Sequence, residues 1–174
     1  GLRLGLFLGI PASVGVILVR QPLTEVVLLG GAFDVSDADR VSTILLAYST
    51  AIWSYSTTHL LVRAFYARRE PMTPVRVAMG MVGLNLTLNL VLVFGTGIGV
   101  AGLAWSTAIC SVVQTAFLAI LLSRRSGALI DRGVLDSVGR TLISTGVMAI
   151  VVGGVLAWVP FDRLAGTWLA ALIA

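Results

Sequence analysis

Long apolar stretches, separated by short polar or glycine-rich connections, run through the whole of this chain. A helix must be roughly 20 residues long to cross the hydrocarbon core of a bilayer, which is about 30 Å thick. The pattern therefore predicts an all-α, polytopic transmembrane helix bundle with five full spans and the start of a sixth. The expected spans are residues 4–29, 41–62, 77–94, 100–122, 141–159 and 164–174, the last of them truncated.

The connections between these stretches are short, which makes consecutive helices antiparallel neighbours. Glycine-rich turns are expected at residues 30–34 and 95–99. Pro22 lacks a backbone donor, so we expect a kink or a short separate interfacial helix there. Residues 1–174 are expected to form a single transmembrane domain.

The composition agrees with a membrane protein and excludes a soluble globule. The chain is 57% hydrophobic and 11% charged, with a mean hydropathy of +1.00, whereas about 25% of the residues of a soluble domain are charged. The first residue is Gly, and the sequence stops at Ala174 inside an apolar run. We therefore expect a piece of a longer protein.

The arginines predict the orientation in the membrane. All twelve basic residues are Arg, and nine of them fall on one side if the predicted spans alternate in direction. The positive-inside rule places that side in the cytoplasm, so the chain is expected to be a multi-pass protein that enters the membrane from the cytoplasm. Anionic lipid head groups explain the net positive charge better than nucleic acid does. The nine are Arg3, Arg63, Arg68, Arg69, Arg76, Arg124, Arg125, Arg132 and Arg140.

Four motifs in the correct order then indicate a family. Residues 63–76, with the sequence RAFYARREPMTPVR, resemble a cytoplasmic loop of the MurJ/MviN lipid flippases. Residues 22–33 resemble the segment at the outer face of that family. Asn85 and Asn89 in the third span fit as well, and so do residues 99–104. The likeness covers residues 1–125 in register and fades towards the end.

This resemblance implies a flippase of the multidrug/oligosaccharidyl-lipid/polysaccharide exporter superfamily in the bacterial cytoplasmic (inner) membrane, which moves lipid II between leaflets by alternating access. The chain would supply spans nine to thirteen and the start of span fourteen, as the C-terminal lobe of a larger transporter. The charged central cavity of the family lies on other spans, so this part is not expected to transport alone. Its expected partners are membrane lipids, the lipid-linked precursor and the N-terminal lobe. The resemblance implies no organic cofactor. It does imply that transport is coupled to Na⁺ or to the proton-motive force.

Some family members bind sodium through the spans that match the third and fourth spans here. By this resemblance the site would comprise Asn85 and Asn89 with a hydroxyl from Ser106 or Thr107. Oxygen ligands suit a hard cation, although Asn89 stands where such a site has a carboxylate. The alternative is that both asparagines only form hydrogen bonds between packed helices.

The arginines of the second cytoplasmic loop have two interpretations. They could simply set the topology, or they could contact the anionic pyrophosphate head group of the substrate, because guanidinium groups suit phosphate. The candidate residues are Arg63, Arg68, Arg69 and Arg76.

Small and hydroxyl side chains also recur along single faces of two spans, which predicts faces turned towards other helices or towards a hydrated path. In the second span they are Thr43, Ala47, Thr50, Ser54 and Thr57; in the fourth they are Gly102, Ser106, Cys110 and Gln114, with Thr107 and Ser111 beside them.

Three other functions remain open from the sequence. A polysaccharide-unit flippase or a multidrug antiporter of the same superfamily would share these spans. An integral membrane transferase is disfavoured, because the acidic residues lie in loops or at span ends and form no acid-rich motif, so we expect no enzyme. A purely structural scaffold is the third.

Overall fold

The computed structural model describes residues 2–28, 35–96, 99–126 and 132–158, and the described residues are helical apart from short turns. The elements are α1 (Leu2–Leu28), α2 (Val35–Ala67), α3 (Met72–Leu90), the π-helix η1 (Val91–Gly95), α4 (Val100–Ser126) and α5 (Arg132–Trp158). The predicted all-α class is confirmed for this part of the chain.

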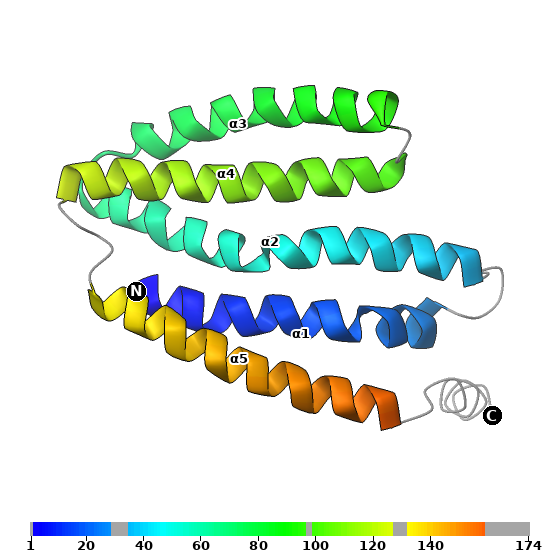
Figure 1. Ribbon diagram of the computed structural model, residues 1–174. Helices are drawn as coiled ribbons and strands as arrows, with labels where there is room; N and C mark the ends of the chain where they lie inside the picture. The colour runs from blue at the N-terminus through cyan, green and yellow to red at the C-terminus, as the bar shows by residue number, and fades with distance from the viewer. Residues whose placement is uncertain (1, 29–34, 97–98, 127–131, 159–174) are drawn as a thin grey trace, which may run out of the picture.

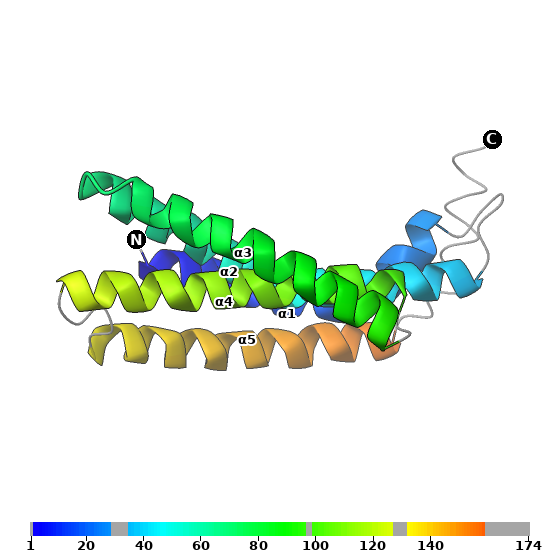
Figure 2. The ribbon, with the colours of Figure 1, turned by 90° about the horizontal axis from the view of Figure 1, so that it is seen from above.

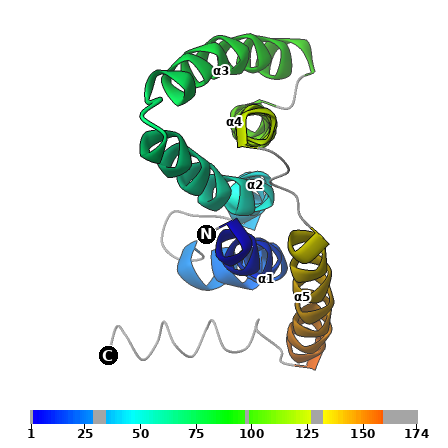
Figure 3. The same cartoon turned by 90° about the vertical axis from the view of Figure 1, so that its left-hand side faces the viewer.

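The helices form a row and do not follow the order of the sequence. Viewed end-on, they lie in the order α3, α4, α2, α1, α5 (Figure 3). The helix pairs α1–α2 and α3–α4 are neighbours both in sequence and in space, whereas α4 packs beside α2 and α5 packs beside α1. The centre of the bundle is therefore made by α2 between α1 and α4.

Four helices are long and apolar enough to cross a membrane, by length and composition, within the described residues. Their candidate spans are Arg3–Glu25, Met72–Gly95, Val100–Arg125 and Asp136–Trp158. The expected count of five full spans and the start of a sixth is thus not confirmed. The sixth predicted span, 164–174, lies outside the described residues.

The second predicted span, 41–62, lies inside α2, which is not among these four. Its 33 residues make a helix about 50 Å long, so length is not what excludes it. Its many Ser and Thr side chains lower its hydropathy, and several of them are buried against neighbouring helices, Ser49 and Ser54 completely. Composition alone counts these hydroxyls as polar, whereas the bundle gives them partners.

Helix α1 runs through Pro11 and Pro22 as one element, and its last turns point away from the axis of the rest (Figure 2). Its contact with α2 is very close at Gly9, where an added Cβ would lie 2.8 Å from Trp53 Cα. Ser13, one turn further on, is buried and accepts a hydrogen bond of 3.1 Å from the Trp53 backbone N–H. Small residues thus let the two backbones approach, as in other membrane bundles.

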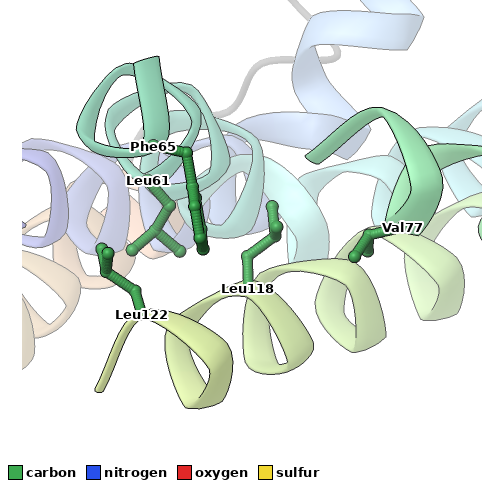
Figure 4. Close-up of a cluster of buried hydrophobic side chains, with 5 residues drawn as sticks. All are labelled: Leu61, Phe65, Val77, Leu118 and Leu122. Carbon is green, nitrogen blue, oxygen red and sulfur yellow. The ribbon is translucent and has the colours of Figure 1, made fainter. Parts of the chain in front are cut away.

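One end of the bundle collects the start of α1, the connection from α2 to α3, the end of α4 and the start of α5 (Figure 1). This is the end that the arginine pattern assigns to the cytoplasm. An apolar cluster lies near it, formed by Leu61 and Phe65 of α2, Val77 of α3, and Leu118 and Leu122 of α4 (Figure 4). The cluster fixes three helices where the polar loop between α2 and α3 begins.

Candidate functional site

Asn85 and Asn89 lie one turn apart on α3, and the structure brings them together with Ser106 of α4. The Asn89 side-chain amide donates to Asn85 Oδ1 at 3.0 Å, and the Ser106 hydroxyl donates to Asn89 Oδ1. Ser106 is fully buried, and both asparagines are half-buried. Three of the four residues proposed for a sodium site therefore form one hydrogen-bonded group, which we call the asparagine cluster.

The fourth residue, Thr107, is not part of this group. Its hydroxyl donates to the carbonyl oxygen of Leu103 at 2.8 Å, within its own helix. The Ser106 hydroxyl is also 2.9 Å from that carbonyl oxygen. Adjacent residues on a helix point about 100° apart, so one of the two hydroxyls faces α3 and the other does not.

The backbone around the asparagine cluster is unusual. Directly after Leu90 the α-helix gives way to η1, a single π-helical turn, and such turns are frequently found at functional sites. Helix α4 approaches this turn at Gly102, where an added Cβ would lie 3.2 Å from the carbonyl carbon of Leu92. Gly102, which the sequence placed on an inward face, is thus needed for the close contact beside the cluster.

The chemistry of the asparagine cluster is that of a neutral oxygen donor set. Each side-chain carbonyl oxygen of Asn85 and Asn89 accepts one hydrogen bond, and a carbonyl oxygen has two lone pairs. The remaining lone pairs suit a hard monovalent cation better than a transition metal. In the described residues there is also no group of three or more His, Cys, Asp or Glu side chains that could hold a metal ion.

A second polar group joins α2 to α4, and the faces predicted from the sequence include its members Ser54 and Ser111 but not Thr58 and Thr115. Ser54 Oγ lies 2.6 Å from Ser111 Oγ, and Thr58 Oγ1 lies 2.6 Å from Thr115 Oγ1. Thr115 also lies within hydrogen-bond distance of the carbonyl oxygens of Ser54 and Ser111, at 3.0 and 2.9 Å. The buried positions of the predicted second-span face are Ala47, Ser54 and Thr57, whereas Thr43 is exposed.

The predicted arginine cluster does not form one site. The loop that carries it is tied to the end of α4: Arg125 pairs with Glu70, and the Arg68 guanidinium donates to the carbonyl oxygen of Arg125 at 3.2 Å. Arg63 and Arg69 are exposed, and Arg69 takes a positive φ of 59° at the turn after α2. Arg125 is thus a cation of this region that the loop motif alone did not identify.

Arg76 lies apart from the loop contacts and lines a cavity of about 410 Å³ between α3 and α4. The guanidinium of Arg125 belongs to the same lining, and apolar residues of both helices make up most of the remainder. The cavity therefore combines two cations at its polar end with an apolar wall. Its other lining residues are Thr73, Val77, Gly80, Met81, Phe117 and Leu121.

Known proteins resemble this chain in both sequence and fold. A probable lipid II flippase MurJ of Vibrio cholerae is 32% identical over 170 residues, which is 98% of this chain and 31% of that protein. One from Thermotoga maritima is 25% identical over 169 residues, which is 91% of this chain and 35% of that protein. A solved structure described as lipid II flippase MurJ in an inward closed conformation matches with a TM-score of 0.71 at 23% identity, over 99% of this chain and 38% of that one.

The chain thus spans between 31% and 35% of the length of these two relatives. The family model described as lipid II flippase MurJ matches residues 1–169, nearly the whole sequence. The resemblance seen in the motifs of residues 1–125 is confirmed and extends beyond them. This chain belongs to the lipid II flippase MurJ family.

Proposed function

We propose that this chain is the C-terminal part of a flippase that carries lipid II across the bacterial cytoplasmic membrane by alternating access. The family match over residues 1–169 carries this proposal, and the relatives reported above bear the lipid II flippase name. In the proposal, residues 1–174 act as one domain in contact with an N-terminal lobe that completes the cavity. Helix α2 crosses the membrane as a fifth span, shielded from lipid by α1 and α4.

Complementation tests the activity directly. The complete gene is restored in a bacterium depleted of its own flippase, and lipid II exposed on the outer leaflet is measured. We expect growth and outer-leaflet lipid II to return. A protein that is expressed and inserted but restores neither would overturn the proposal in favour of another lipid-linked glycan or drug export.

We propose further that the asparagine cluster binds Na⁺ and couples it to transport. The geometry supports this because Ser106, Asn89 and Asn85 form one chain of hydrogen bonds, which brings three oxygen-bearing side chains together beside the π-turn. Thr107 is left out, because its hydroxyl bonds to its own helix and, unlike that of Ser106, does not reach Asn89. The site is proposed to be weak, since affinity for hard cations depends on ligand charge and these ligands are neutral.

Two substitutions at Asn89 separate binding from packing. Asn89→Ala should remove the sodium dependence of lipid II flipping, whereas Asn89→Asp should lower the sodium concentration needed, because it adds a charged oxygen ligand. Thr87→Ala is the matched control, since Thr87 is exposed and bonds only to Gly83 of its own helix. If all three variants respond to sodium like the unaltered protein, the cluster only joins α3 to α4.

For the substrate head group, we propose Arg76 as the principal contact among the four candidate arginines. It lines the cavity between α3 and α4, whereas Arg63 and Arg69 are not among the lining residues and Arg68 donates to the end of α4. Arg76→Gln should reduce lipid II binding to the complete protein in a titration with purified lipid. Arg63→Gln is the control of equal charge, and equal losses in both would indicate a role in topology or surface charge alone.

A further inference from the structure

A second polar cavity, distinct from the sites above, lies between the first turns of α1 and the first turns of α5. It has a volume of about 410 Å³. The candidate spans of the two helices begin at Arg3 and Asp136, and both residues line the cavity. It therefore opens at the level where a membrane meets the cytoplasm, which is the depth of phospholipid phosphates. The lining residues are Arg3, Phe7, Gly133, Asp136, Ser137, Arg140, Thr141 and Ser144.

The charged side chains of this cavity have no partners among the described residues. Arg3 and Arg140 each carry a guanidinium that forms no ion pair or hydrogen bond with the part of the chain that the structure describes. Asp136 lines the same space and pairs with neither of them. A cavity with two unpaired cations and one unpaired anion complements a ligand that has both a phosphate and a positive group.

The backbone of α5 is shaped to admit the Arg3 side chain. An added Cβ at Gly133 would collide with the Arg3 guanidinium, so this guanidinium lies directly against the first turn of α5. Gly139, on the same helix, has nothing within 4 Å of an added Cβ. The hydroxyl of Thr141 is turned to the Ser137 carbonyl oxygen at 2.8 Å, whereas Ser144 is exposed and offers a donor beside the arginines.

We propose that this cavity binds the head group of an aminophospholipid. Arg3 and Arg140 hold the phosphate, since guanidinium groups donate paired hydrogen bonds to phosphate oxygens. The carboxylate of Asp136 accepts from the primary ammonium, and Phe7, which is 52% exposed, contacts the start of an acyl chain. The bound lipid joins α5 to α1 at the cytoplasmic end of the bundle.

Native mass spectrometry of the complete protein in detergent tests this site with three probes: phosphatidylethanolamine, phosphatidylglycerol and phosphatidylcholine. All three carry the phosphate, but only the first carries an ammonium that can donate hydrogen bonds. We expect one saturable lipid and tighter binding of phosphatidylethanolamine, by about tenfold over phosphatidylcholine, the ratio for one hydrogen bond to a charged group. Equal affinity for all three would overturn the aminophospholipid assignment.

Four variants examine the two halves of the site. Arg3→Gln and Arg140→Gln should each weaken the binding of every phospholipid by about tenfold or more. Arg124→Gln should not, because Arg124 lies at the same end of the bundle but does not line the cavity. Asp136→Asn should abolish the preference for phosphatidylethanolamine and favour phosphatidylglycerol. If Arg124→Gln weakens phospholipid binding as much as the cavity variants do, the effect is one of general surface charge and the proposal is overturned.

Two glycine substitutions, which leave the charge of the protein unchanged, control for misfolding and for effects of surface charge. Gly133→Ala should weaken binding because it displaces the Arg3 guanidinium, while Gly139→Ala should not. The displaced atom is the end of a flexible side chain, so the fold should survive. If Gly133→Ala binds lipid normally, Arg3 does not act from this cavity. Inorganic phosphate serves as the last probe. If it displaces the lipid at equal concentration, the site recognises only the phosphate, and the proposed role of Asp136 is overturned.

Discussion

The α2–α4 and α1–α5 interfaces both contain buried hydroxyl groups, and they satisfy them in different ways. Between α2 and α4 the hydroxyls pair across the helices, Ser54 with Ser111 and Thr58 with Thr115. Between α1 and α5, the described side chains form no helix-to-helix hydrogen bond, and the buried Thr145 hydroxyl has no partner among the residues that the structure describes. The first interface is closed and internally satisfied, and the second leaves polar groups available.

This difference has a physical cause and a consequence. A polar group out of water costs free energy unless it is hydrogen-bonded, so the buried hydroxyls at the centre of the bundle bond either across the helices or, like Ser49, to their own helix. At the α1–α5 interface the polar groups line a cavity at the membrane boundary, where a head group or water supplies the missing partners. A rigid centre and a ligand-dependent edge are the expected result.

The largest effect is expected from a bulky side chain placed in each interface. Ser54→Leu should lower the free energy of unfolding by about 1–3 kcal/mol, because Ser54 is fully buried and overpacking a filled site has this cost. Ser144→Leu, at the exposed edge of the second interface, should change it by less than about 0.5 kcal/mol. Denaturation of the complete protein in detergent measures both, and equal losses would show that the second interface is as tightly packed as the first.

Two threonine-to-valine substitutions should change the free energy of unfolding in opposite directions. Thr145→Val should raise the free energy of unfolding by about 1 kcal/mol, because it removes a buried hydroxyl without a partner. Thr115→Val should lower it by a similar amount, because that hydroxyl lies within bonding distance of three oxygen atoms. The same denaturation experiment compares the two, and destabilisation by both would mean that the Thr145 hydroxyl has a partner.

The smallest effect is the coupling within one hydroxyl pair. A double-mutant cycle with Ser54→Ala and Ser111→Ala should give a coupling free energy of about 0.6 kcal/mol, the average for hydrogen bonds between membrane helices. A cycle that combines Ser54→Ala with Ser137→Ala, which lie in different interfaces, should give none. Zero coupling in the first cycle would mean that packing of small residues, and not hydrogen bonding, holds α2 to α4.

Much of the fold followed from the sequence because apolar length is a local property. The stretches 77–94 and 100–122 correspond to α3 with η1 and to α4. The second span was harder to classify, because its serines and threonines reduce its hydropathy and only the neighbouring helices show that they are satisfied. The family could be recognised from the loop motifs, because short motifs and their order are properties of the sequence and do not depend on which helices pack together.

The candidate site was predictable in part. Helical periodicity places Asn85 and Asn89 on one face, and a buried face of α4 was expected at Ser106. Choosing between Ser106 and Thr107 needed the structure, because adjacent residues differ only in which helix they face. The gathering of Arg3 with Asp136 and Arg140 was invisible in the sequence, since Arg3, at the start of α1, lies more than 130 positions before the other two, at the start of α5.

The sequence by itself determined the helical class, the placement of most of the arginines at one end and the family, because each depends on residues that are close along the chain. Only the tertiary structure decided that α5 packs against α1 and not against α4, that Arg125 pairs with Glu70, and which hydroxyls meet. These outcomes depend on how whole helix faces fit together. The free energy of that fit is shared among many small contacts, so no local pattern carries it.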